Sequence, residues 1–362
     1  MRKTLLYVII LAVLGVGIYY FLFNKKASLY DRSEAAFNIK DTGNIGKIFI
    51  ASPNGITATV ERTDSGWMVN KQYKALPTTI KNVLTTLYQQ EALAPVTSAA
   101  HDLVIKSLAT EGIKVEVYDR KGSKMTTFYV GGEATNNMGT NMLTEGATQP
   151  YIVQIQNFNG YLTTRYTTNI RDWRDRTVFD VPADQIKEVS VVYTDKPINS
   201  FTLKQDNGKI SFDADKAIAG NTPKLNMRKA NVYLKYFTNL NCEGYINGAP
   251  NLDSMIKNTK KHSAIDLTTV KGQHQHLDIY WLPLNRRSKN TLTSDPDVPD
   301  EYDADRLYAI MNDNKDTVMI QRYVFSKLFR NAYEFYEADD STGRTHVSDE
   351  QPRNFMIHHK PQ

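Results

Sequence analysis

An internal duplication limits the fold of this chain more than any other feature of its sequence. Residues 45–180 and 181–337 carry the same ordered series of apolar strands, Gly turns and one apolar helix face. Chance can supply one matching pair, but not the ordered series. The matching positions are Ile45, Ile48 and Ile50 with Ile186, Val189 and Val191; Val83, Leu84 and Leu87 with Tyr233, Leu234 and Phe237; and Val115 and Val117 with Ile265 and Leu267.

Each copy indicates antiparallel strands combined with a helix. Apolar residues alternate with polar ones from Ile56 to Glu61, and the turn at 64–66 leads into a further strand. Pro77 suits the first turn of a helix, and residues 158–166 suit a short closing helix. We therefore expect the α+β class: an N-terminal transmembrane helix followed by two tandem diverged repeats of antiparallel sheet with helices on one face.

The chain starts with an apolar run, Leu5 to Phe23, that is long enough to span a bilayer. A helix of this length measures about 28 Å, close to the hydrocarbon thickness. Its Leu, Ile, Val and Phe residues contribute about −4 to −8 kcal/mol to insertion. Bulky aromatic residues occupy 19–23, where a cleavage site would need small ones. We expect an uncleaved signal-anchor.

The expected segments follow from this anchor: residues 1–26 as anchor, 27–44 as a tether, the two repeats, and 338–362 as a polar disordered tail. Lys and Arg flank both ends of the apolar run, so the charge rule is nearly balanced. A long domain behind such an anchor is usually exported. We expect a single-pass protein of the bacterial inner membrane with its bulk in the periplasm.

Composition excludes several functional classes. The net charge is +5, but the charged residues are interspersed without a basic stripe, so no nucleic-acid partner is expected. The single Cys242 cannot form an internal disulfide, and we expect it to be buried. The sequence carries no G-x-S-x-G elbow, Walker loop, dinucleotide fingerprint or H-E-x-x-H motif. We expect no catalytic residues, cofactor or metal.

Two groups of residues are candidate metal ligands. His274 and His276 are spaced to lie on one face of a strand, but two ligands do not close a site, and solvent-facing positions are the simpler interpretation. The acidic stretch 295–305 fails the EF-hand pattern because Pro299 is at its fifth position and Arg306 replaces the bidentate Glu. Neither group predicts a metal site.

The second repeat contains an insertion, residues 284–305, that the first repeat lacks. Pro296 and Pro299 disfavour a regular helix or central strand there. Because a long connection inside a compact domain is usually functional or disordered, we expect this loop to contact a partner and to contribute little to stability. The candidate contact residues are Arg286, Arg287, Lys289, Asp295, Asp297 and Asp300.

These features resemble the bacterial membrane-anchored family known as domain-of-unknown-function 4340. The likeness rests on the apolar anchor, a strand pair ending at Gly66-Trp67, the helix face of Leu84 and Leu87, and three later segments, 129–132, 142–143 and 171–179. It covers roughly residues 45–330. The resemblance implies an association with ABC-type transport and gliding-motility components in some genomes, and it implies no catalytic residues.

The preferred hypothesis is a non-catalytic envelope protein that binds or scaffolds protein partners in a membrane-associated complex. The alternative is a periplasmic glycan- or peptide-binding module that uses a groove between the repeats. An uncharacterised hydrolase is third, because catalytic residues can assemble from distant positions. The sequence does not identify a small-molecule ligand.

Overall fold

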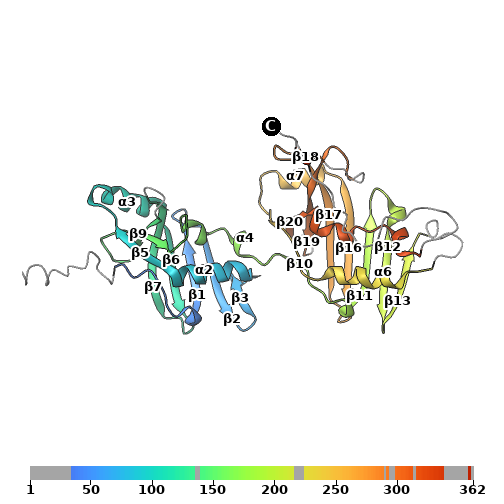
Figure 1. Ribbon diagram of the computed structural model, residues 1–362, viewed down its shortest axis with the longest axis horizontal. Helices are drawn as coiled ribbons and strands as arrows, with labels where there is room; N and C mark the ends of the chain where they lie inside the picture. The colour runs from blue at the N-terminus through green and yellow to red at the C-terminus, as the bar shows by residue number, and fades with distance from the viewer. Residues whose placement is uncertain are drawn as a thin grey trace, which may run out of the picture. The chain divides into compact units, whose positions relative to one another are not determined.

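The computed structural model describes residues 34–134, 139–215, 224–288, 291–292, 298–312, 315–337 and 358–359. The chain forms two compact units that divide between Asp175 and Arg176 (Figure 1). The division falls just ahead of the boundary expected after residue 180, because strand β10 (Thr177–Phe179) pairs with β14 (Leu240–Asn241) of the second unit.

The expected membrane helix, 5–23, lies outside the described residues, as does the expected tail from 338 onward apart from residues 358–359. Among the residues that are described, no helix is long and apolar enough to cross a membrane.

In the first unit, nine strands form one antiparallel sheet in the order β4-β3-β2-β1-β6-β7-β8-β9-β5. Their bounds are β1 (Ile45–Ala51), β2 (Thr57–Thr63), β3 (Gly66–Val69), β4 (Tyr73–Lys74), β5 (Gln90–Pro95), β6 (Ile113–Asp119), β7 (Lys124–Glu133), β8 (Thr140–Thr144) and β9 (Tyr151–Ile155). The helices are α2 (Pro77–Gln89), α3 (Ser98–Glu111) and α4 (Ile170–Trp173), with 3₁₀ turns η1 (Thr42–Asn44) and η3 (Thr163–Arg165).

In the second unit, eight strands form an antiparallel sheet in the order β13-β12-β11-β16-β17-β19-β20-β15. Their bounds are β11 (Ile186–Tyr193), β12 (Phe201–Asp206), β13 (Lys209–Ala214), β15 (Gly244–Tyr245), β16 (Lys261–Thr269), β17 (His274–Pro283), β19 (Tyr302–Met311) and β20 (Asp316–Gln321). The helices are α6 (Met227–Leu234), α7 (Leu252–Lys257) and α8 (Arg322–Phe325), with 3₁₀ turns η4 (Ala183–Gln185), η5 (Pro197–Asn199), η6 (Lys235–Phe237), η7 (Ser326–Leu328) and η8 (Ala332–Phe335). A separate pair joins β18 (Thr291–Leu292) to β21 (His358–His359).

The two sheets have the same strand order once β4 is set aside. Their registers correspond as well: Ile48 pairs with Val60 and Val117 in the first sheet, and Val189 pairs with Leu203 and Leu267 in the second. The α+β class with antiparallel sheets is therefore confirmed. The shared register also assigns each position of one unit to a counterpart in the other.

Each unit closes in the same way, with its last segment returning to the start of its helix. The Leu76 amide donates to the Trp173 carbonyl at 2.7 Å, and the Asn226 amide donates to the Phe335 carbonyl at 2.8 Å. Trp173 and Phe335 are both buried. An ion pair flanks each contact: Lys74 with Asp175 at 3.0 Å, and Lys224 with Glu337 at 2.9 Å.

Because side chains alternate between the two faces of a strand, the apolar residues of each sheet lie on one face, which α2 covers in the first unit and α6 in the second. In the first unit, α2 buries Ile80, Val83 and Leu87 against this face. In the second, α6 buries Ala230, Tyr233 and Leu234, and Tyr233 packs edge-on against Phe201. The buried faces carry the hydrophobic driving force of each unit.

The structure differs from the expected local structure at two helices of the first unit. The sequence did not predict helix α3, which buries only Leu108. Leu108 packs so closely on β7 that a Cβ at Gly131 would come within 2.9 Å of the Leu108 side chain. The closing helix expected over residues 158–166 shrinks to η3, because Asn157 and Gly160 adopt positive φ values of 62° and 143°. Such residues interrupt a helix.

The expected tether also ends earlier than residue 44. Phe37 is 1% exposed and makes edge-on contacts with Phe128 and Tyr151. The Gln90 side-chain amide donates to the Phe37 carbonyl at 2.6 Å. Residues 34–44 therefore belong to the first unit, because burial of an aromatic side chain outweighs the polar character of its neighbours.

The helix positions differ in burial, and this yields a prediction. Leu234 is 1% exposed, whereas Leu84, expected in the core, is only half-buried. Leu234→Ala should therefore destabilise the protein by about 2–5 kcal/mol, and Leu84→Ala by clearly less. Urea unfolding of the two variants measures both values. Equal losses would show that Leu84 is a core residue after all.

Candidate functional site

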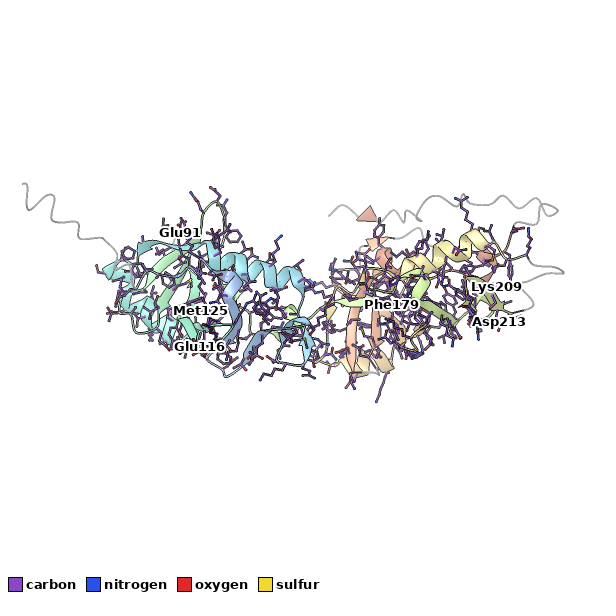
Figure 2. All side chains as sticks on the ribbon, turned by 90° about the horizontal axis from the view of Figure 1, so that it is seen from below. Glu91, Glu116, Met125, Phe179, Lys209 and Asp213 are labelled. Carbon is purple, nitrogen blue, oxygen red and sulfur yellow. The ribbon has the colours of Figure 1, made fainter. Side chains whose placement is uncertain are left out.

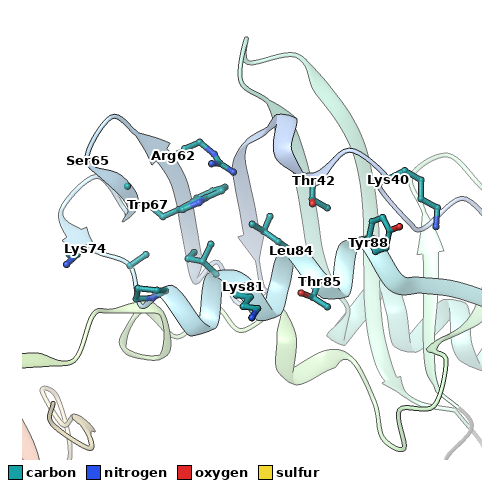
Figure 3. Close-up of a pocket in the computed structure, with 14 residues that line it drawn as sticks. Lys40, Thr42, Arg62, Ser65, Trp67, Lys74, Lys81, Leu84, Thr85 and Tyr88 are labelled. Atoms are coloured by element: carbon teal, nitrogen blue, oxygen red, sulfur yellow. The ribbon is translucent and has the colours of Figure 1, made fainter. Parts of the chain in front are cut away.

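The first unit contains a groove of about 760 Å³ between helix α2 and the hairpin of strands β2 and β3 (Figure 3). This volume is in the range of small-molecule and peptide pockets. The groove is lined by Lys40, Thr42, Arg62, Ser65, Gly66, Trp67, Lys74, Ala75, Pro77, Ile80, Lys81, Leu84, Thr85 and Tyr88.

Local sequence explains how the walls are positioned. Pro77 occupies the first turn of α2, whose remaining lining residues come from successive turns of the helix. On the other side, Gly66 adopts a φ of 117°, which a side chain would disfavour, and starts β3 directly before Trp67. Figure 3 shows Trp67 on the hairpin side and Leu84 on the helix, at the apolar part of the groove.

Two of the groove's cations lie over aromatic rings. The Arg62 guanidinium is 4.8 Å from the centroid of the Trp67 ring, and the Lys40 ammonium is 4.9 Å from that of Tyr88. Arg62 Nε also donates to the Ile45 carbonyl at 3.2 Å. These contacts hold the charged groups in position without neutralising them, because an aromatic face carries no net charge.

The charge of the groove is uncompensated within the described residues. No Asp or Glu is among its lining residues, and Lys40, Arg62 and Lys81 make no ion pair in the described part of the chain. Lys74 differs, since it is paired with Asp175. Burial, and then the positive charge of Arg120, lower the pKa of Arg62. The guanidinium therefore lies in an environment that favours an anion.

The second unit shows that the fold does not need these charges. By register, the counterpart of Arg62 is Gln205 and that of Trp67 is Ile210. Along the helix, Lys81 corresponds to Asn231, given that Ile80 and Val83 correspond to Ala230 and Tyr233. The same framework thus accepts neutral side chains in place of Arg62, Lys81 and the Trp67 indole, whereas the cation Lys74 is kept as Lys224.

The insertion residues predicted from sequence lie elsewhere, in the second unit. Arg286, Arg287 and Asp300 are exposed, and the other three, Lys289, Asp295 and Asp297, lie outside the described residues. The proposed partner contact of this set therefore stays a prediction.

The insertion is also shorter and less loop-like than expected. Val298 is buried in the core of the second unit, and strand β19 begins at Tyr302. Pro283 pairs with Tyr302, and the Leu284 amide donates to the Glu301 carbonyl at 3.1 Å. Residues 298–305 are thus structural, because they complete the sheet and cover its apolar face.

Sequence reasoning missed the groove, although a signal was present. The apolar residues and Gly turns that reveal the duplication are shared by both copies, whereas the informative difference is the loss of two cations, Arg62 and Lys81, in the second copy. Cys242 is buried, as expected. In the described residues, no group of three or more His, Cys, Asp or Glu side chains has the arrangement of a metal site.

Comparison with known proteins identifies one family. A family model described as Domain of unknown function (DUF4340) matches residues 96–263. The chain resembles the DUF4340 family. The match is narrower than the expected 45–330, and it leaves out the groove, whose lining residues all precede it. Searches of curated proteins and of solved structures found no match.

The counterpart residues allow a test of whether the groove charges serve the fold. Arg62→Gln and Lys81→Asn introduce the residues that the second unit has at these positions, so each should change the free energy of unfolding by less than about 1 kcal/mol. Urea denaturation of each variant gives this value. A loss well above about 2 kcal/mol would show that the cations are structural.

Proposed function

We propose that this chain is a non-catalytic, membrane-tethered binding protein that holds an acidic segment of a partner protein in the groove of its first unit. The observation that carries the proposal is that Lys40, Arg62 and Lys81 line this groove without an ion pair in the described part of the chain. The second unit has the neutral Gln205 and Asn231 in place of Arg62 and Lys81. If the protein needed only the fold that both units share, the first unit would not need cations where the second has neutral side chains.

The chemistry of the groove favours a ligand with both acidic and apolar groups. Arg62 can bind a carboxylate through paired N–H donors, and Lys40 and Lys81 add point charges at the rim. Trp67 and Leu84 provide an apolar surface between them. A peptide that carries acidic residues beside a hydrophobic one satisfies both requirements.

The proposal also includes the membrane tether and the periplasmic location. It is supported by the apolar run Leu5 to Phe23 and by the resemblance to the DUF4340 family. The tether would keep the groove close to membrane proteins, since residue 40 is at most about 60 Å of extended chain beyond Phe23. Partners in a membrane-associated complex are therefore within reach.

A glycan is the second candidate ligand. Trp67 and Tyr88 offer aromatic faces to the groove, and Tyr88 is 47% exposed. Acidic groups on a glycan would meet the same cations. The glycan candidate predicts binding that depends on the aromatic residues at least as strongly as on the charges.

The test measures binding of a fluorescent peptide of alternating Glu and Leu to the full-length protein. We expect Arg62→Gln combined with Lys81→Asn to weaken binding about tenfold or more, equivalent to about 1.4 kcal/mol. Binding should also weaken as salt is raised, because exposed charges are screened. Fluorescence anisotropy gives the dissociation constants.

The matched control removes two charges from the same unit outside the groove, with Lys106→Asn and Lys121→Gln, and should leave binding unchanged. A Lys-Leu peptide should not bind. Equal affinity of the wild type and the groove variant for the acidic peptide would rule out the proposed site. Binding of an acidic oligosaccharide but not of the peptide would favour the glycan candidate.

The tether gives a separate prediction. The mature protein should retain its N-terminal residues, and protease added to spheroplasts should digest the soluble part. Mass spectrometry and immunoblotting measure the two outcomes. A mature N-terminus after Phe23, or full protection from protease, would contradict the proposed topology without bearing on the groove.

A further inference from the structure

We propose that Asp266, His276 and Asp278 form a proton-dependent lock between strands β16 and β17, on the face of the second sheet opposite its core. The lock is closed when His276 carries a proton on both ring nitrogens and opens when it loses one. This inference does not depend on the groove of the first unit.

The geometry places one imidazole between two carboxylates. His276 Nδ1 is 2.7 Å from Asp266 Oδ1 on the neighbouring strand, and His276 Nε2 is 2.9 Å from Asp278 Oδ1 on its own strand. Asp266 and His276 are directly paired across the strands. Both ring nitrogens are thus within hydrogen-bond distance of a carboxylate oxygen.

Hydrogen-bond chemistry then selects the charged form of the ring. An ionised carboxylate only accepts hydrogen bonds, and a neutral imidazole has a single N–H. Only the doubly protonated ring can donate to both Asp266 and Asp278. Loss of one proton leaves a ring lone pair facing a carboxylate oxygen, which is repulsive. The contacts therefore require protonation.

The other charged groups around His276 are few. His274 Nε2 is 3.1 Å from Asp266 Oδ1, and Lys261 Nζ is 2.6 Å from Asp278 Oδ1. Tyr280 follows on the same strand. On β11, the other neighbour of β16, Ser190 pairs with Asp266 and Glu188 pairs with Thr268. Glu188 forms an ion pair with Lys204. On the β19 side, the uncharged Ile310 pairs with Asp278. Asp266 and Asp278 are therefore the charges in direct contact with the ring.

The pKa of His276 agrees with this arrangement. Burial by itself lowers it, but the hydrogen bonds and negative charges of Asp266 and Asp278 outweigh burial and raise the pKa above 6.5. A group with a raised pKa in the folded state stabilises the fold below its unfolded pKa. This stabilisation is lost as the pH rises through the folded pKa. The lock consequently weakens from mildly acidic toward alkaline conditions.

The first unit surrounds the equivalent carboxylate with lysines instead of histidines. Glu116, labelled in Figure 2, is the counterpart of Asp266. Glu116 pairs with Phe49, and Asp266 pairs with Ser190 at the equivalent position of the second sheet. Its cationic neighbours are lysines: Lys114 at 2.8 Å and Lys124 at 3.7 Å. Lysine remains charged throughout the range in which histidine titrates. By register, Thr127 stands where the second unit has His276, so a histidine at this place is specific to the second unit.

The test compares the wild type with His276→Gln, as full-length proteins, by urea unfolding from pH 5.5 to 8.5. The variant should have a lower midpoint than the wild type at pH 5.5, and the difference should shrink as the pH rises. Lys124→Gln in the first unit is the matched control, and its difference from the wild type should stay constant over this range. The other histidines are the same in the wild type and the variant, so their contribution cancels when the two midpoints are subtracted at each pH. One of these is His101, whose pKa is also raised by its hydrogen bonds to Asp102 and the Thr148 carbonyl.

A second measurement follows the ring directly. In an NMR titration, His276 should be more than half protonated at pH 6.5, and Asp266→Asn with Asp278→Asn should reduce that fraction. A pH-independent difference between the wild type and His276→Gln would overturn the proposal, as would a His276 ring less than half protonated at pH 6.5. A midpoint that EDTA lowers in the wild type but not in the variant would also overturn it, by identifying a metal site instead.

Discussion

The packing of one apolar sheet face against one helix is the interaction on which both units depend. In an antiparallel sheet, alternate residues point to the same face, so Ile48, Val60 and Val117 lie side by side and must be removed from water. The helix α2 supplies the cover, and the returning end of the unit holds its first turn through the Leu76–Trp173 hydrogen bond. The same construction recurs in the second unit with Asn226 and Phe335.

The duplication separates what the fold requires from what it tolerates. Core positions keep their apolar character across the copies while changing volume: Ala58 faces the core where Phe201 does in the second unit, and Val83 corresponds to Tyr233. Such exchanges are accepted when neighbouring side chains repack. Outside the core, Arg62 and Lys81 of the groove and the histidine between two carboxylates each occur in one copy alone, so these features are not demanded by the fold.

Local patterns predicted most of the strands and α2, because each strand buries one face and its apolar residues recur at period two. They failed where burial is decided by distant residues. Helix α3 carries the exposed Leu103 and the buried Leu108, and Leu108 is the one that lies against Gly131 of β7. Phe37 looked like an isolated aromatic residue in a polar segment, yet it fills space between Phe128 and Tyr151.

The sequence alone predicted the α+β class, the tandem repeat and the identity of most core positions, because periodicity and internal similarity are properties of the chain itself. The groove and the lock were decided by tertiary structure. Arg62, Trp67 and Lys81 come from two strands and a helix, and Asp266 meets His276 only through the register of β16 with β17. Electrostatic interactions fall off with distance through space, not along the sequence, so only the folded chain determines which charges meet.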